Sequence, residues 1–362
     1  MNKNATHGVE QLGGLLDIVA PLVDSSEAAV LARKHFGLDV LSAQALDGER
    51  DRNFRLKDRS GKEFILKVVH PAERPDVTDL QSRVLLHIEK TDPELQVPRV
   101  VMPVDTAECD VVWRQEGRPD RRIRCLTYLR GLPLRLSRRG TMQRANLGAF
   151  LARLDLALRD FTHSADDHDL LWDLKSADRI RPLLAGLPDP ILRELAYQAM
   201  DRYTSTTSAL LPSLRRQVIH NDFNPNNVLV DPVCEDRIAG IIDFGDLIRS
   251  PMVQDLATAA AYQIEPEGHP LQALAEMAVA FDAVLPLFPE EIEVLPDLVA
   301  TRLVLSVAIS TWRAEQQPEN AAYLLRNHKS CSANLEKLLQ ISPIDSVAWL
   351  RKSMEARRGP SN

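Results

Sequence analysis

The sequence predicts an α+β protein of two lobes, a β-rich N-terminal lobe followed by a larger and mainly helical C-terminal lobe. Short runs of alternating apolar residues, typical of half-buried strands, are concentrated before Leu129. From Arg130 onward, segments rich in alanine and leucine repeat with helical spacing. The length of 362 residues also suits two domains or lobes with ample core. We therefore expect an N-terminal lobe over residues 1–129 and a C-terminal lobe over residues 130–362.

The N-terminal lobe is expected to begin with a helix, SSEAAVLARKHF, capped by Ser25 or Ser26, because serine hydroxyls accept backbone N–H bonds at helix starts. A strand is predicted in LDVLSAQAL. A hairpin is predicted in NFRLKDRSGKEFILKVV, where the turn residues DRSG separate two apolar runs. After Pro75, TDLQSRVLLHIEK has the apolar spacing of an amphipathic helix. Further strands are expected in VPRVVMPV, DVVWRQ and RIRCLTYL.

The C-terminal lobe is expected to consist of helices interrupted by two short strands. Helical periodicity dominates TMQRANLGAFLARLDLALRDF, PILRELAYQAMDRYTSTTSALL and LVATRLVLSVAISTWRAEQQ. The strands are predicted in VLVD and RIAGIID. Gly131 and Pro133 follow the last N-terminal strand, and these residue types favour a hinge between the lobes.

Composition narrows the class of protein. The formal net charge of −7 argues against a general nucleic-acid binder, because phosphate-backbone affinity comes from lysine and arginine patches. The four cysteines are far apart, without metal-ligand spacing, as is typical of reduced thiols in a cytoplasmic protein. We find no signal-peptide pattern and no run of the roughly 18 apolar residues that a membrane helix needs. We expect a cytoplasmic protein with neither nucleic acid nor a membrane as partner.

Two motifs in the C-terminal lobe carry oxygen-rich side chains. In HNDFNPNNVLV, Asp222 and Asn227 flank a loop rich in proline and asparagine that can turn both toward one point. In IAGIIDFGD, Asp243 follows an apolar run. Mg²⁺ prefers oxygen ligands and keeps phosphate oxygens among them, so one amide oxygen, one carboxylate and nucleotide phosphates would satisfy it. Asp222 could then take the proton of an acceptor hydroxyl.

The order of these motifs parallels the catalytic loop and D-F-G triplet of protein kinases. The N-terminal lobe supplies Lys67 on the predicted strand EFILKVV. GERDRNF, with Asn53 as a candidate nucleotide contact, lies where a phosphate-covering loop should be, although it lacks the glycines of G-x-G-x-x-G. We interpret His220 as a brace for the loop and Asp255 as a helix-start and packing residue, because carboxylates favour helix N-termini.

These motifs resemble the aminoglycoside phosphotransferase/choline kinase superfamily over nearly the whole chain. GERDRNF, LLWDLKSA, HNDFNPNNVLV, GIIDFGD and QPENAAYL are most similar to the hydroxylysine kinase group. The resemblance implies a protein-kinase-like fold, with ATP as co-substrate (GTP is also possible) bound by the N-terminal lobe, and Mg²⁺ as cofactor. It also implies that Asp222 is the catalytic base, assisted by Asn227. Asn227 and Asp243 would hold Mg²⁺, and Lys67 would contact the α- and β-phosphates.

Further nucleotide contacts follow from the same resemblance. Thr127 and Leu129 would meet adenine through their backbone. The helix that should carry a glutamate partner for Lys67 has Gln81 instead, which could hydrogen-bond the lysine without forming an ion pair. Asp79 on the same helix could share that role.

The acceptor is expected to be a small hydroxylated amine or amino acid. An amino acid carries a carboxylate and an ammonium group, so its pocket should contain an arginine and some carboxylate or aromatic surface. The candidates are Asp246, Arg302, Trp172 and Asp173.

We expect an ATP-dependent kinase for the hydroxyl of an amino alcohol or hydroxy-amino acid, with hydroxylysine favoured. Homoserine, choline or ethanolamine, and aminoglycosides are alternative acceptors. A catalytically silent nucleotide-binding module of the same fold is the alternative from another class. A protein kinase is disfavoured, because no A-P-E or activation loop follows the D-F-G triplet. The sequence leaves the oligomeric state open.

Overall fold

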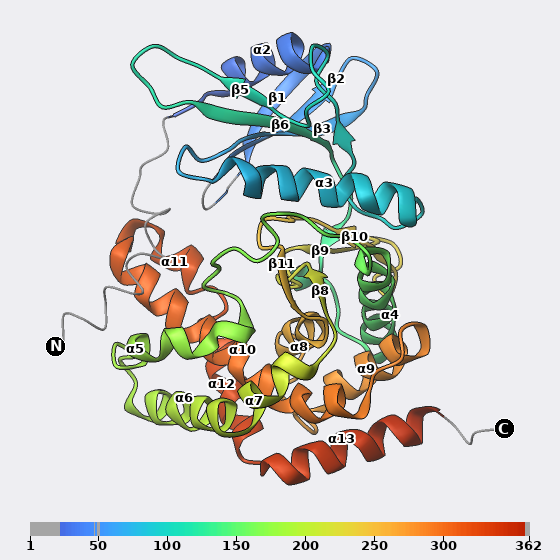
Figure 1. The fold of residues 1–362 in the computed structure, drawn as a ribbon, viewed down its shortest axis with the longest axis vertical. Coiled ribbons are helices and arrows are strands. Elements are labelled where there is room, and N and C mark those ends of the chain that lie inside the picture. The colour runs from blue at the N-terminus through green and yellow to red at the C-terminus, as the bar shows by residue number, and fades with distance from the viewer. Residues whose placement is uncertain (1–21, 47, 49–50, 359–362) are drawn as a thin grey trace.

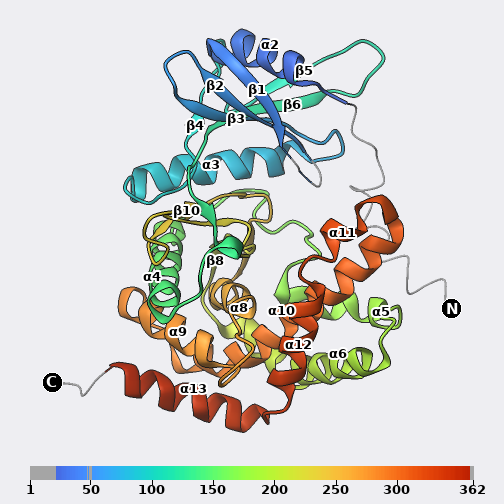
Figure 2. The ribbon, with the colours of Figure 1, turned by 180° about the vertical axis from the view of Figure 1, so that it is seen from behind.

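The computed structural model describes residues 22–46, 48 and 51–358, and it confirms the two-lobe α+β architecture. A small lobe built on a twisted antiparallel sheet lies above a larger lobe of helices (Figure 1). The view from behind shows the same division, with helix α3 between the sheet and the larger lobe (Figure 2).

The N-terminal sheet has the strand order β1-β2-β3-β6-β4, with β5 also paired to β6, and every pair is antiparallel. Its strands are β1 (Val40–Leu46), β2 (Arg52–Asp58), β3 (Glu63–Val68), β4 (Val100–Val101), β5 (Val111–Trp113) and β6 (Arg121–Thr127). In β3, Phe64 and Leu66 are buried against helix α2 (Ser25–Phe36). Ile65 and Lys67 alternate with them and line the cleft between the lobes.

The N-cap of helix α2 lies just before Ser25 and Ser26, the two residues that the sequence analysis predicted as caps. Asp24 is the N-cap, and its carboxylate accepts the backbone N–H of Glu27 at 2.8 Å. Ser26 instead donates its hydroxyl to Asp24. A carboxylate is the stronger cap here, because it is negatively charged at the positive end of the helix.

Helix α3 (Pro75–Thr91) joins the two lobes through its apolar face. The predicted apolar residues Leu80, Val84, Leu85 and Ile88 are buried. They belong to the same hydrophobic core as Leu147 and Leu151 of helix α4 in the C-terminal lobe. A second, smaller core lies between the sheet and α2. The position of α3 is therefore set by packing against the larger lobe as well as the sheet.

The C-terminal lobe surrounds the long, mostly buried helix α10. Its α-helices are α4 (Thr141–Leu158), α5 (Arg181–Leu184), α6 (Pro190–Arg202), α7 (Ser208–Leu210), α8 (Val253–Ala261), α9 (Gln272–Val284), α10 (Pro289–Gln316), α11 (Ala321–Leu324), α12 (His328–Leu339) and α13 (Pro343–Arg358). The short helical turns are Leu134–Leu136, Leu174–Ile180, Tyr203–Thr207, Leu211–Ser213 and Pro318–Asn320. Although α10 has 28 residues, neither it nor any other helix in the described ranges is long and apolar enough to cross a membrane.

Five short strands lie in the described part of the C-terminal lobe, residues 130–358, where the sequence analysis predicted two. They are β7 (Leu132–Pro133), β8 (Arg216–Ile219), β9 (Val228–Val230), β10 (Ile238–Ile241) and β11 (Ile248–Pro251). The predicted strands are β9 and β10, which pair antiparallel. The sequence analysis did not predict β7, β8 and β11, which contain two to four residues.

Gly131 and Pro133, the predicted hinge, pack closely against strand β9, and the hinge itself stays a prediction. Strand β7, which contains Pro133, pairs with β9. A Cβ atom on Gly131 would lie only 2.7 Å from the Cβ of Leu229. The glycine thus allows the backbone to approach β9 closely. The division of the chain at residues 129 and 130 stays a prediction.

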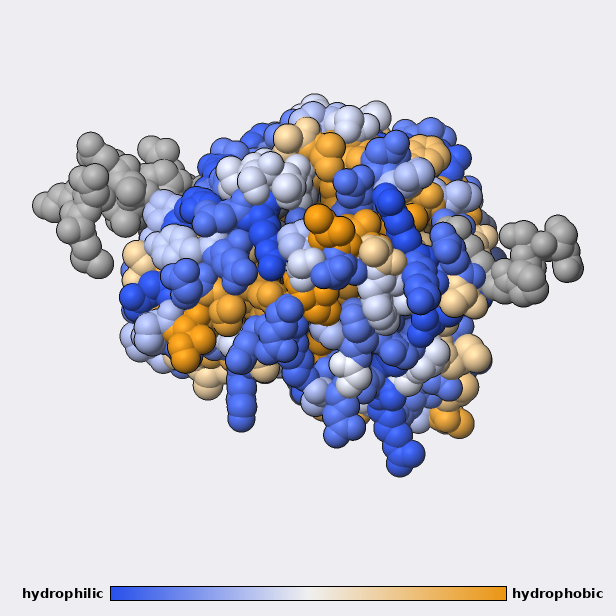
Figure 3. All heavy atoms as spheres, turned by 90° about the horizontal axis from the view of Figure 1, so that it is seen from below, coloured by the Kyte–Doolittle hydropathy of each residue, from blue (hydrophilic) through white to orange (hydrophobic). Residues whose placement is uncertain are grey.

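The face of the C-terminal lobe that points away from the cleft is largely hydrophilic (Figure 3). Apolar side chains form patches between the polar ones. The cavity that brings the predicted site residues together is on the other side of this lobe, where it meets the N-terminal lobe.

Candidate active site

A cleft between the lobes contains nearly all the predicted site residues. It has a cavity volume of about 530 Å³, within the range of small-molecule sites. Strands β2, β3 and β6 and helix α3 line it from the N-terminal lobe, and the loops after β8 and β10 and helix α10 line it from the other. The predicted residues that line it are Asn53, Lys67, Gln81, Thr127, Leu129, Trp172, Asp222, Asn227, Asp243, Asp246 and Arg302.

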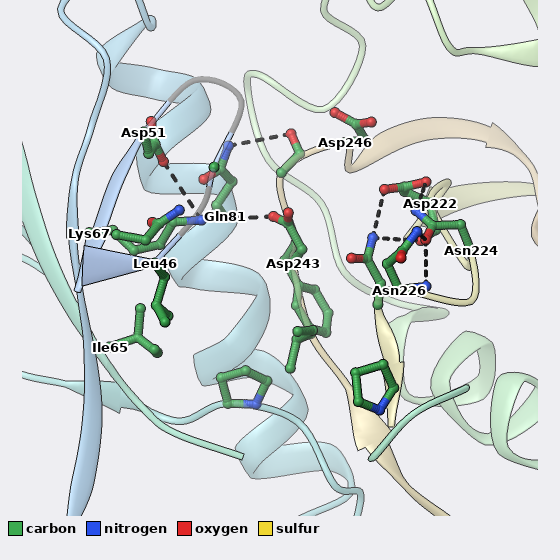
Figure 4. Close-up of a pocket in the computed structure, with 18 of the residues that line it drawn as sticks. Leu46, Asp51, Ile65, Lys67, Gln81, Asp222, Asn224, Asn226, Asp243 and Asp246 are labelled. Atoms are coloured by element: carbon green, nitrogen blue, oxygen red, sulfur yellow. Dashed lines mark hydrogen bonds and ion pairs between the residues drawn. The ribbon is translucent and has the colours of Figure 1, made fainter. Parts of the chain in front are cut away.

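Asp222 lies in the loop between β8 and β9 (Figure 4). Three side chains orient its carboxylate. Asn224 Nδ2 donates to Oδ1 at 2.8 Å and Asn227 Nδ2 donates to Oδ2 at 2.7 Å. From α10, Arg302 Nη2 donates to Oδ1 at 3.2 Å. Burial and the charge of Asp246 raise the pKa of Asp222 to about 7, although Arg302 opposes the shift. A fixed carboxylate with a pKa near neutrality can both accept and release a proton.

Helix α8 holds the backbone of this loop. Asp255 accepts the N–H of His220 at 2.8 Å and the N–H of Asn221 at 2.6 Å. Asn221 has a left-handed φ of 62°, which asparagine tolerates better than most residues. Burial lowers the pKa of His220, whose Nδ1 accepts the N–H of Asp222 at 3.2 Å. His220 is therefore a brace, as expected, and Asp255 anchors the loop in addition to packing in its helix.

Asp243 and Asn227 supply oxygen atoms suited to a divalent cation. Asp243 follows β10 with a left-handed φ of 64°, and its side chain is 53% exposed in the cleft. The amide nitrogen of Asn227 donates to the backbone oxygen and the carboxylate of Asp222, so its Oδ1 is the atom that could bind a cation. Among the described residues, no group of three or more histidine, cysteine or acidic side chains could hold a metal. Asp243 and Asn227 fit Mg²⁺ if phosphate oxygens and water complete its coordination.

Lys67 lies between two carboxylates (Figure 4). Its Nζ is 3.6 Å from Asp51 Oδ2 and 3.8 Å from Asp243 Oδ1. Asp51 is itself held, because its Oδ1 accepts the N–H of His70 at 3.0 Å. Asp51 therefore provides the acidic partner that was expected from α3.

The structure corrects the expected role of Gln81. Its Oε1 accepts a hydrogen bond from Arg124 Nη2, and its Nε2 donates to the backbone oxygen of Gly245 at 3.4 Å. Gln81 thus does not hydrogen-bond Lys67. Asp79 instead hydrogen-bonds His163 and Arg83, which lies one turn further along α3.

The predicted nucleotide contacts lie toward the N-terminal side of the cleft. Asn53 is opposite Lys67 in the register of β2 and β3. Residues 49 and 50 of GERDRNF lie outside the described residues. The backbone N–H of Thr127 donates to the oxygen of Arg99 at 2.9 Å, so this N–H is not available to adenine. Leu46 and Ile65 form part of the apolar wall, which suits a planar base (Figure 4).

Arg302 lines the cleft but is already paired. It is 2% exposed. Besides Asp222, its Nε donates to the Tyr262 hydroxyl at 3.2 Å and its Nη1 to the backbone oxygen of Trp172 at 3.3 Å. The guanidinium also lies 4.9 Å from the centre of the Trp172 ring. Arg302 therefore fixes the carboxylate of Asp222 and the wall of the cleft together.

Asp173 is not part of the cleft, contrary to the prediction. It caps the short helix Leu174–Ile180, accepting the N–H of Lys175. It also accepts the Ser250 hydroxyl at 2.7 Å and forms an ion pair with Lys175 at 3.1 Å. These contacts make it a structural residue.

The sequence analysis missed several residues that shape the site. Asp51 belongs to the quoted GERDRNF segment, and its acidic side chain near the phosphate-covering loop was a usable signal. Asp255 was interpreted as a helix-start and packing residue, and its hydrogen bonds to the backbone of the catalytic loop were not predicted. Asn224 lies inside the quoted loop two residues after Asp222, so its position was a usable signal. Arg124 carried no signal by spacing, because its partner Gln81 is 43 residues away.

Known proteins resemble this chain in sequence and in fold. The family model described as phosphotransferase enzyme family matches residues 43–287. Hydroxylysine kinase from Mus musculus is 25% identical over 341 residues, covering 89% of this chain and 90% of the mouse protein. Its counterpart from Danio rerio is 24% identical, covering 93% of this chain and 98% of the fish protein. The structure of a microcompartment-associated aminopropanol kinase is similar with a TM-score of 0.62 and 19% identity, covering 90% of this chain and 99% of that one. An amicoumacin kinase in complex with AMP-PNP and Ca²⁺ has a TM-score of 0.63 and 13% identity, with coverages of 92% and 96%.

Proposed function

The chain belongs to the phosphotransferase enzyme family, and on this premise we propose that it transfers the γ-phosphoryl group of ATP to the hydroxyl of a small hydroxy-amino acid or amino alcohol. Hydroxylysine is the favoured acceptor, because the relatives named hydroxylysine kinase are similar to this chain over most of the length of both proteins. The observation that carries the proposal is the convergence of Asp222, Asn227, Asp243 and Lys67 in one cleft. This set is intact, which argues against a silent nucleotide-binding module.

The proposed reaction is a direct in-line transfer. The acceptor hydroxyl gives its proton to the carboxylate of Asp222, and its oxygen forms a bond to the γ-phosphorus. The bond from that phosphorus to the bridging oxygen breaks, and ADP leaves with the electron pair. Asn224, Asn227 and Arg302 hold the carboxylate, so its orientation needs little rearrangement. Lys67 balances part of the phosphate charge.

The donor set suits Mg²⁺ and a nucleotide. Asn227 and Asp243 would hold the metal, which would neutralise charge on the phosphates when bound. An ATP-dependent reaction also fits the cytoplasmic location expected from the sequence. The AMP-PNP and Ca²⁺ in the amicoumacin kinase support a nucleotide and a divalent cation for the fold.

The acceptor end of the cleft carries charges of both signs. Arg302, Arg313 and Arg326 line it from α10 and the segment after α11, whereas Asp222 and Asp246 line it from the loops. An arginine fork can bind a carboxylate, and carboxylates can bind an ammonium group. A hydroxy-amino acid offers both groups.

The test is an acceptor screen with Mg-ATP, using hydroxylysine, homoserine, ethanolamine, choline and one aminoglycoside. ADP release is measured, the phosphorylated product is identified by mass, and GTP is compared with ATP. We expect the highest kcat/KM for hydroxylysine. Preference for an aminoglycoside would overturn the acceptor assignment. Failure on every acceptor, together with no binding of Mg-ATP, would favour the silent module.

A further inference from the structure

A buried arginine lies beside Lys67 with most of its hydrogen-bonding groups unused. Arg124 on β6 is the register partner of Lys67 on β3, so both side chains project from the same face of the sheet. Arg124 lines the cleft and is 2% exposed. Its Nη2 donates to Gln81 Oε1, whereas its Nε and Nη1 are buried without a hydrogen-bond partner. Within the described part of the chain, no carboxylate forms an ion pair with it.

Such a guanidinium is costly in a folded protein. Arginine stays protonated under ordinary conditions, and burying a charge is unfavourable unless it is paired. The amide of Gln81 satisfies one donor but supplies no counter-charge. The charges of Asp51 and Asp243 act on Arg124 without a direct ion pair, and both carboxylates form ion pairs with Lys67 instead. The unused donors therefore indicate an anion that binds from the cleft.

We propose that Arg124 is a second phosphate-binding cation of the nucleotide site, positioned by Gln81 and acting beside Lys67. The identification of the anion as a nucleotide phosphate rests on the proposed function. Two of its three nitrogens are buried without a hydrogen-bond partner, and guanidinium N–H groups suit phosphate oxygens. It is also adjacent to the lysine that the fold directs at the same ligand. Two cations thus bind the phosphates. Lys67 is held by its ion pair with Asp51, and Arg124 is held by its hydrogen bond to Gln81.

This arrangement explains why position 81 carries an amide. A glutamate there would form an ion pair with Arg124 and compensate its charge within the protein. It would also remove the donor that Gln81 Nε2 provides to the backbone oxygen of Gly245. That bond links α3 to the loop that carries Asp243. A neutral acceptor holds the guanidinium in place while leaving its charge for a ligand.

The first test compares ligands that differ only in phosphates. Calorimetry measures the Kd of Mg-ADP and of adenosine for the wild type and for Arg124→Met. Removing hydrogen bonds from a cation to phosphate should weaken Mg-ADP binding about ten- to a hundredfold, with adenosine affinity unchanged. Arg122→Met is the matched control, because Arg122 is on the same strand and pairs with Asp110 away from the cleft. It should leave both affinities unchanged. Equal weakening of adenosine and Mg-ADP by Arg124→Met would overturn the proposal.

The second test uses Gln81→Glu, which retains the arginine and the size of the side chain. We expect weaker Mg-ADP binding with unchanged adenosine affinity, and a higher Tm without nucleotide, since the new ion pair is internal. Unchanged or stronger Mg-ADP binding would overturn the proposal, because it would mean that position 81 does not direct Arg124 at phosphate. This variant decides the question if Arg124→Met fails to fold.

Both tests are independent of acceptor turnover. If Mg-ADP binding depends on Arg124 but no acceptor is phosphorylated, the proposed function fails and the assignment of Arg124 stands. If the wild type binds adenosine and Mg-ADP equally, the assignment of Arg124 fails whatever the acceptor screen shows.

Discussion

Replacing Arg302 with methionine separates two roles for this residue. The sequence suggests that Arg302 receives the carboxylate of the acceptor, whereas the structure places its Nη2 3.2 Å from Oδ1 of Asp222. If Arg302 acts on Asp222, its charge lowers the pKa of that carboxyl and opposes burial, which raises the pKa to about 7. Arg302→Met should then raise that pKa further, since the stabilising charge is lost and the burial remains.

The size of the effect follows from this contact. At pH 7.5 a carboxyl with a pKa of about 7 is about three quarters ionised. An opposite charge this close typically displaces a carboxyl pKa by about one to three, so the ionised fraction should fall to between about a quarter and below one per cent. If the ionised form is the active base, kcat/KM at this pH should fall about 3- to 200-fold, and it should recover as pH rises.

The assay measures kcat/KM against pH for a hydroxy-amino acid and for its decarboxylated amino alcohol, at one saturating Mg²⁺ concentration. An effect through Asp222 lowers kcat/KM for both acceptors alike and moves the acid limb of the pH profile to higher pH. Arg302→Lys is the control, because it retains the charge and should move the limb less. A loss confined to the hydroxy-amino acid, with an unmoved limb, would refute the reasoning and assign Arg302 to the acceptor carboxylate.

Three further predictions concern single carboxylates. Asp222→Asn should lower kcat about 10²- to 10⁴-fold, because it removes the general base, while Mg-ATP affinity measured by calorimetry stays nearly unchanged; full activity would exclude this role. Asp243→Ala should abolish the metal dependence of nucleotide binding, since it removes a proposed ligand, and the same titration with and without Mg²⁺ checks it. Burial raises the pKa of Asp255 to about 6, so the folded state binds more protons than the unfolded state between about pH 4 and 6. Its contribution to the free energy of unfolding should therefore fall as pH rises through that window; thermal unfolding of Asp255→Asn should lack this component, and identical pH dependence in both proteins would contradict it.

The residues of the catalytic loop could be predicted from the sequence because they are close along the chain. Asp222 and Asn227 flank one turn, and Asp243 follows a short buried strand. The turn brings Asp222 and Asn227 together, and the pairing of β9 with β10 brings Asp243 to the same place. The two lobes and most of the long helices could be predicted as well, since apolar periodicity indicates which face of an element is buried.

Tertiary structure decided the partners of those residues. Gln81 and Arg124 are 43 positions apart, and Asp222 and Arg302 are 80 apart. Asp173, expected in the cleft, became a helix cap. A pattern in the sequence records the type and spacing of side chains, but hydrogen-bond partners depend on how separate elements pack. The sequence therefore determined which types of reactive side chain the cleft can contain. Packing decided which acid, amide or arginine lies beside each of them. The physical reason is that charge pairing acts over a few ångströms, whatever the separation of the two residues along the chain.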